Sequence, residues 1–233
     1  MKRLAGPAVL IGVLISSFLP AVLWASGGSH APRPTGSSSS MPAPKKTPEQ
    51  QAVDHYNAGL KFRDKALAFQ TEEAQASGPE KRTKLEKKAQ QAFEKAIEQF
   101  REATAKYPRY YQAFSDLGFA LRKTGDHAGA LEAYDHALSL SPAYAPAIEY
   151  RGEAYLGLDR VEDAKSAYMT LFGADRAQAD LLLKAMKGWV EKRRAEPGSL
   201  SPDSVQEFSA WLSQREELAG QTPSVSELQQ RKW

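Results

Sequence analysis

The sequence predicts an all-α protein made of stacked helix hairpins. Two observations support this prediction: short helix-forming segments joined by brief loops, and a 34-residue spacing at which small and aromatic residues recur. A fixed period of this length is typical of repeat architectures, in which each unit buries its apolar face against its neighbours. The pairs related by this spacing include Gly118 and Gly152, Ala130 and Ala164, and Tyr134 and Tyr168.

Small residues stand at positions where larger ones would form a better helix. Gly118 lies inside a predicted helix, where glycine costs about 1 kcal/mol relative to alanine. We expect this cost to be offset by the close approach of two helices in one hairpin, with Gly118 and Ala130 at the contact. The predicted repeat-packing residues are Gly59, Ala96, Phe100, Gly118, Ala130, Tyr134, Gly152, Ala164 and Tyr168.

The middle unit, residues 111–144, identifies a family. It has Phe114, Leu117, Gly118 and Leu121 at the spacing W-x2-L-G-x2-Y, followed by Ala130-x3-Tyr134, Ala137 and Pro142, and so resembles the tetratricopeptide repeat. The unit at 145–178 keeps the glycine but has Arg151 in place of leucine and no closing proline. The resemblance covers residues 47–178. It implies a right-handed superhelical stack of about three hairpins with a concave, partner-binding groove.

The first unit, residues 47–108, is longer than the other two. Gly59 and Ala96 are 37 residues apart, where the corresponding residues of the other units are 12 apart. Helix-forming residues continue through the insertion, so we expect two elongated antiparallel helices at about 48–76 and 79–106. Thr47 and Gln50 form a capping box at the start. We name the segment between Gly59 and Ala96, residues 60–95, which contains the insertion, the arm.

The N-terminus predicts export. Residues 1–25 have Lys2 and Arg3 before an uncharged apolar run, which is the layout of a secretory signal. An uncleaved membrane anchor at residues 4–24 is the alternative. Residues 26–46 are rich in Ser, Gly and Pro and are expected to be a disordered linker. Both readings place the remainder outside the cytoplasmic membrane, in a periplasmic, secreted or membrane-anchored protein.

The C-terminal region predicts helices that cover the open end of the stack. Residues 179–196 are expected to form a capping helix, because a stack exposes apolar surface at its end. Residues 197–233 are expected to be a further helical segment that packs on its own domain, with a partner or dimer contact as the alternative. The apolar residues concerned are Leu182, Met186, Trp189 and Val190 in the first helix, and Val205, Phe208, Trp211 and Leu212 in the second.

Composition argues against several classes of function. The chain carries a net charge of +3, or +1 without Lys2 and Arg3, which is too balanced for a dedicated nucleic-acid binder. It has no cysteine, and its four histidines (His30, His55, His127 and His136) are not at metal-ligand spacing. No nucleophile or phosphate-binding motif occurs. We therefore expect no metal, no cofactor and no catalysis.

A basic run at residues 80–88 lies near the end of the arm. It contains Lys81, Arg82, Lys84, Lys87 and Lys88. We favour a solvated face, partly neutralised by Glu72 and Glu73 of the facing helix. The alternative is docking to an acidic partner or to anionic lipid headgroups.

In tetratricopeptide proteins the first helix of each hairpin lines the groove, and the resemblance transfers this role by position. Phe119 and Arg122 stand out, because aromatic and arginine residues dominate interface energetics, although packing of Phe119 against the next unit is an equal alternative. Arg63 and Arg122 at one end, with Glu149 and Glu153 at the other, favour a mixed-charge peptide. The family's basic clamp for a C-terminal carboxylate is disfavoured, because the sites that need Lys, Asn and Arg are occupied by Ser115, Phe119, Glu149 and Glu153. The predicted groove residues are Tyr56, Leu60, Arg63, Gln112, Ser115, Phe119, Arg122, Glu149, Glu153 and Leu156.

These features together predict a non-catalytic protein-interaction module, an adaptor or assembly factor of the cell envelope. Two alternatives stay open. One is a docking subunit of an envelope enzyme or protease that carries no chemistry itself. The other is a membrane-anchored scaffold that self-assembles into a homo-oligomer. Fold-level analogy does not name the partner.

Overall fold

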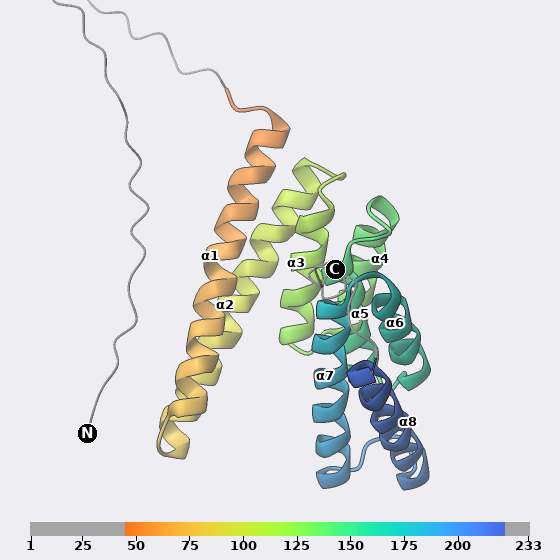
Figure 1. Cartoon of the computed structure of the whole chain (residues 1–233). Helices are drawn as coiled ribbons and strands as arrows, with labels where there is room; N and C mark the ends of the chain where they lie inside the picture. The colour runs from red at the N-terminus through yellow and green to blue at the C-terminus, as the bar shows by residue number, and fades with distance from the viewer. Residues whose placement is uncertain (1–44, 222–233) are drawn as a thin grey trace, which may run out of the picture. The chain divides into compact units, whose positions relative to one another are not determined.

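The computed structural model describes residues 45–221 (Figure 1). The predicted signal segment, most of the predicted linker and residues 222–233 of the predicted C-terminal segment lie outside this range. Within residues 45–221 all regular secondary structure is α-helical, and the predicted fold class is confirmed. None of the helices in this range is both long enough and apolar enough to span a membrane.

The first hairpin is elongated, as the insertion predicts. α1 (Pro48–Gln75) and α2 (Pro79–Lys106) have 28 residues each and lie side by side (Figure 1). The Thr47 hydroxyl accepts a hydrogen bond from the Gln50 backbone at 3.2 Å, and the Gln50 side chain accepts one from the Thr47 backbone at 3.0 Å. This capping box fixes where α1 begins.

Two shorter hairpins follow in the chain. The first consists of α3 (Tyr111–Lys123) and α4 (His127–Leu140), and the second of α5 (Ala145–Gly157) and α6 (Val161–Ala174). Each helix packs against the next one in the chain, and α3 also contacts α1 and α5. The first helices of successive hairpins therefore lie next to one another and share a face, which we name the first-helix face.

Glycines mark the closest approach within the hairpins. A Cβ atom on Gly59 would lie 2.5 Å from the Phe100 ring, and one on Gly118 would lie 2.6 Å from the Tyr134 ring. Gly152 differs, because the nearest atoms belong to Leu182 of α7 (Arg176–Ala195), at 2.6 Å. The other predicted packing residues, all with no exposed surface, are Ala96, Phe100, Ala130, Tyr134, Ala164 and Tyr168.

The C-terminal helices form a fourth hairpin. α7 packs against α5 and α6, and α8 (Pro202–Gln221) packs against α7. α7 begins three residues before the predicted capping helix, because the Asp175 side chain accepts a hydrogen bond from the Gln178 backbone at 3.1 Å. The apolar stripe of α8 packs on its own domain: Val205, Phe208 and Leu212 are buried.

Asp159 fastens this fourth hairpin to the loop between α5 and α6. Arg193 donates from Nε and Nη2 to Oδ1 at 2.9 and 2.6 Å, and the Ser199 hydroxyl donates to Oδ2 at 2.6 Å. Burial alone would raise the pKa of Asp159, but the hydrogen bonds from Ser199 and Arg193 outweigh it and hold that pKa below its usual value. Its backbone has φ +57°, where Gly125, one period earlier, has φ +90°.

Residues 45–221 have a core of their own. They belong to one compact unit, and every buried residue of this range lies in that unit. This segment is therefore suited to solution experiments without residues 1–43.

We expect Gly118→Ala to destabilise this segment by about 2 kcal/mol or more, because the added methyl group overlaps the buried Tyr134 ring. Gly188→Ala is the matched control in α7, where nothing lies within 4 Å of the added atom. It should stabilise by about 0.5–1 kcal/mol. Urea unfolding followed by circular dichroism measures both. Equal stability of Gly118→Ala and the wild type would contradict the close approach.

Asp159→Gly should lower the free energy of unfolding by about 2 kcal/mol near neutral pH, because glycine tolerates the backbone conformation but loses the hydrogen bonds. The folded pKa of Asp159 is lowered, so its stabilisation is complete above the unfolded pKa and is lost as pH falls through the folded one. The deficit of the variant should therefore shrink as pH falls below the ordinary pKa of an aspartate, about 4. A deficit independent of pH would refute a role for the carboxylate charge.

Candidate partner-binding face

Asp116 of α3 joins the first two hairpins on the first-helix face. Its Oδ2 accepts a hydrogen bond from the Tyr56 hydroxyl at 2.8 Å, and its Oδ1 pairs with Arg63 Nη1 at 2.7 Å. Two predicted groove residues are thus brought together by an aspartate that the sequence analysis did not single out. The pair is partly buried, so Arg63 is engaged within the protein.

Tyrosines surround this aspartate. The rings of Tyr56 and Tyr110 have centroids 4.8 Å apart. Burial raises the pKa of Tyr110 and of Tyr144, and the negative charge of Asp116 adds to both shifts. The same causes raise the pKa of Tyr56, together with its hydrogen bond to Asp116. These phenols therefore stay protonated and act as hydrogen-bonding groups.

Arg122 is paired within the protein. Its guanidinium forms an ion pair with Glu153 of α5 and lies 5.4 Å from the Phe119 ring centroid and 5.6 Å from that of Tyr150. We expected Arg122 and Glu153 to lie towards opposite ends of the groove, and that expectation is wrong. The two side chains stand on neighbouring helices, where opposite charges stabilise each other.

Phe119 serves mainly to pack the units together. It is 9% exposed and lies between Phe93 of α2, at a centroid distance of 6.3 Å, and Tyr150 of α5, at 5.1 Å. Three further predicted groove residues, Ser115, Glu149 and Leu156, are also buried. Leu60 and Gln112 are half-buried. The first-helix face is thus more closed than the sequence predicts.

A hollow of about 400 Å³ remains on this face, and we name it the first-helix hollow. Its floor contains Phe119 and Tyr150, and α7 adds Leu181, which is 53% exposed, and Lys184. The 34-residue spacing predicts that Tyr150 and Lys184 occupy the same position in their units as Asp116, because the three residues are successively 34 residues apart. The lining residues are Phe119, Arg122, Lys123, Glu149, Tyr150, Glu153, Leu181, Lys184 and Ala185.

Glu149 is the buried carboxyl group of this hollow, and its surroundings favour the protonated form. Its side chain is almost fully buried, and burial is the largest cause that raises its pKa, to about 8. The charge of Glu153 and a hydrogen bond with Glu153 raise it further. Burial and the neighbouring Arg122 lower the pKa of Lys123. The surroundings therefore disfavour the charged form of both Glu149 and Lys123.

Metal coordination finds no support in the described residues. Between residues 45 and 221, no group of three or more His, Asp or Glu side chains is placed to hold a metal ion. His55 instead lies 3.0 Å from the Gln99 side chain, and the ring of His136 stacks on Phe114. The arrangement is suited to recognition through apolar, aromatic and charged side chains.

Stacked hairpins with a shared first-helix face define a helical repeat protein. The family model described as tetratricopeptide repeat matches residues 111–144, which comprise α3, α4 and the residues that follow. Residues 111–144 are therefore a tetratricopeptide repeat, and the resemblance that the sequence shows in this unit is confirmed.

Matching solved structures include the first TPR of Spaghetti (RPAP3) bound to an HSP90 peptide, 18% identical over 57% of this chain and 94% of that one, with a TM-score of 0.41. A crystal structure of MamA is 20% identical over 55% of this chain and 81% of that one, with a TM-score of 0.35. A second MamA structure is 20% identical over 65% and 98%, with a TM-score of 0.31. The chain has no significant match among curated proteins.

Glu149→Gln removes the buried titrating group and keeps its size. In the wild type the free energy of unfolding should fall as pH rises from about 5 to about 8, because the unfolded chain releases this proton at lower pH than the folded state. The glutamine variant should lack most of this fall and be more stable than wild type by about 1–2 kcal/mol near pH 9. Urea titrations at several pH values test this, with exposed Glu132→Gln as the control. Parallel pH profiles for all three proteins would contradict it.

Proposed function

We propose that this protein is a non-catalytic adaptor or assembly factor of the cell envelope that binds a partner protein through its first-helix face. Tetratricopeptide repeats are protein-interaction modules, whose stacked units present an extended binding surface. The particular binding face, the lack of catalysis and the cell-envelope compartment are the parts that we propose for this protein.

The exposure of Leu181 is the observation that supports this face. This leucine is 53% exposed and lines the same hollow as Tyr150 and Lys184, a hollow formed by three successive first helices. Apolar surface of this kind is stabilised by a partner that covers it, while the charged rim sets the orientation. A peptide or helix with an apolar anchor and charged flanks fits this chemistry.

The signal segment predicted at the N-terminus supports the envelope assignment. Lys2 and Arg3 before an apolar run at residues 4–24 are the features of a signal segment, whether cleaved or retained. The rest of the chain then works outside the cytoplasmic membrane, in the periplasm, secreted, or tethered to the membrane.

Site-specific cross-linking tests the proposal, and the absence of cysteine from the chain makes it practicable. Leu181→Cys carries a photoreactive benzophenone in the first-helix hollow. Met169→Cys is the matched control, since Met169 is 47% exposed on α6 and does not line the hollow. After irradiation in an envelope extract of the source organism, we expect a defined cross-linked partner from Leu181→Cys alone.

Two results would contradict the proposed face. Equal cross-linking from both positions would place the contact elsewhere, and cross-linking from Met169→Cys alone would move it to the second helices. Circular dichroism of both variants verifies that each is folded. A cross-link between two copies of the chain would instead favour the self-assembling scaffold.

A further inference from the structure

The arm concentrates the positive charge of the chain. Residues 60–95 contain nine Lys and Arg against six Asp and Glu, a net charge of +3 that equals the net charge of the whole chain. All other residues together carry equal numbers of acidic and basic side chains. A charge confined to one hairpin creates a local positive potential that attracts anionic groups.

Lysines of both helices and phenylalanines of α1 line the groove between α1 and α2. Lys65 Nζ and Lys88 Nζ lie 5.8 and 5.3 Å from the centroid of the Phe69 ring, and Lys95 Nζ lies 5.8 Å from that of Phe62. These distances are within the range of cation–π attraction, so the ammonium groups are held over the rings. We name this feature, with a volume of about 280 Å³, the arm groove.

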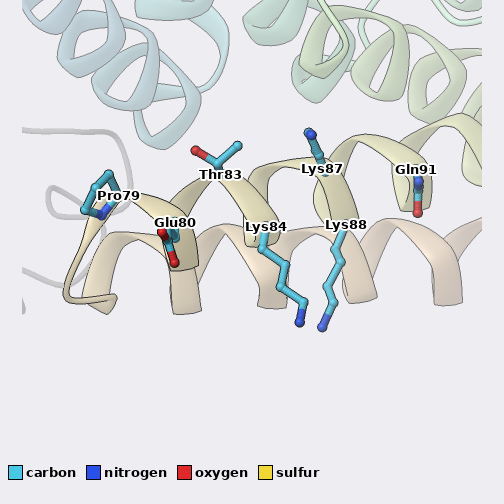
Figure 2. A pocket seen from close by; sticks show the side chains of 7 residues that line it. All are labelled: Pro79, Glu80, Thr83, Lys84, Lys87, Lys88 and Gln91. Carbon is cyan, nitrogen blue, oxygen red and sulfur yellow. The ribbon is translucent and has the colours of Figure 1, made fainter.

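The arm groove continues along α2. A second, shallow hollow of about 600 Å³ contains Lys84, Lys87 and Lys88, so Lys88 belongs to both. Figure 2 shows Lys84 and Lys88 extending side by side on one side of α2, and Lys87 on the other. From Lys84 to Lys95 the lysines of α2 cover about 16 Å, which is about three turns of helix.

Little inside the protein neutralises these lysines. None of the ion pairs formed among residues 45–221 involves Lys65, Lys84, Lys87, Lys88 or Lys95. The acidic residue that lines the hollows is Glu80, at the first turn of α2. Glu72 and Glu73, expected to neutralise this run, form no ion pair with it. The lysines of the run are exposed, as a solvated face requires, but the ion pairs by which Glu72 and Glu73 would neutralise them are not formed among the described residues.

We propose that the arm groove binds a short acidic amphipathic helix of a partner protein, with its carboxylates on the lysines and its apolar side chains against Phe62 and Phe69. The surface has both components that such a segment needs, positive charge and aromatic carbon, over the length of about three helical turns. It lies on a different hairpin from the first-helix hollow and is a second binding surface.

The geometry disfavours two other anionic partners. Phe62 and Phe69 are partly buried and lie beneath ammonium groups, so neither ring projects far enough to insert into a bilayer. Stacking of nucleic-acid bases requires an open ring face, and lysines occupy faces of both rings. Carboxylates can approach the ammonium groups from outside while apolar side chains contact the ring edges.

The test uses residues 44–233 and a fluorescein-labelled peptide of about 16 residues, helical, with Glu on one face and Leu and Phe on the other. Fluorescence anisotropy measures its affinity. We expect Lys84→Glu with Lys88→Glu to weaken binding about tenfold or more. Lys81→Glu with Lys106→Glu has the same charge change on the same helix outside both hollows. This control should stay within about twofold of wild type.

Two further comparisons separate the charged and aromatic contributions. Replacing every Glu of the peptide by Gln should weaken binding about tenfold. Phe62→Leu with Phe69→Leu keeps apolar volume but removes the rings, and should weaken binding about threefold or more. Circular dichroism confirms that each variant remains folded.

Several outcomes would overturn the proposal. They are no binding of the acidic peptide, equal affinity for the Glu and Gln peptides, and equal loss in the two double lysine variants. Binding to vesicles of phosphatidylserine and phosphatidylcholine, but not to the peptide, would assign the arm to membranes. Cross-linking from Leu181→Cys is independent of all these results. The first-helix hollow and the arm groove are therefore tested separately.

Discussion

The close contact of a glycine with an aromatic ring is the constraint on which the hairpins depend. Gly59 faces Phe100 and Gly118 faces Tyr134 at distances that no Cβ atom could occupy. This approach fixes how the two helices of a hairpin lie together. Because the hairpins stack on one another, it also fixes which side chains of α1, α3, α5 and α7 share a face. The first-helix hollow is a consequence of packing that the glycines permit.

The same constraint explains why the fold could be predicted from one sequence. Small and aromatic residues recur every 34 residues because each hairpin packs in the same way, so the period indicates which residues are buried. Helix starts were readable where a side chain caps them, as at Thr47. The 34-residue period does not predict the neighbour of Gly152, which is Leu182 of α7. The repeats end with α6, and α7 packs directly on α5.

The candidate site was less predictable, for a physical reason. The period identifies the face on which a side chain lies but not its partner on the neighbouring helix. Arg122 and Glu153 belong to the predicted face, yet their ion pair depends on the distance between α3 and α5. The burial of Phe119 and the raised pKa of Glu149 likewise arise from packing within the formed stack. Such contacts exist only once the stack has formed.

The distribution of charge suggests how two surfaces would divide the work of binding. On the first-helix face the charges are largely satisfied within the protein, through the Arg63–Asp116 and Arg122–Glu153 pairs. A partner there gains from shape and apolar contact more than from long-range attraction. The arm keeps its net charge, and unpaired charge accelerates encounter over roughly a Debye length, about 10 Å. A partner with an acidic helix and a separate apolar anchor would meet the arm first and then gain effective concentration at Leu181. Two modest contacts on a small stack would then give an affinity that neither provides alone.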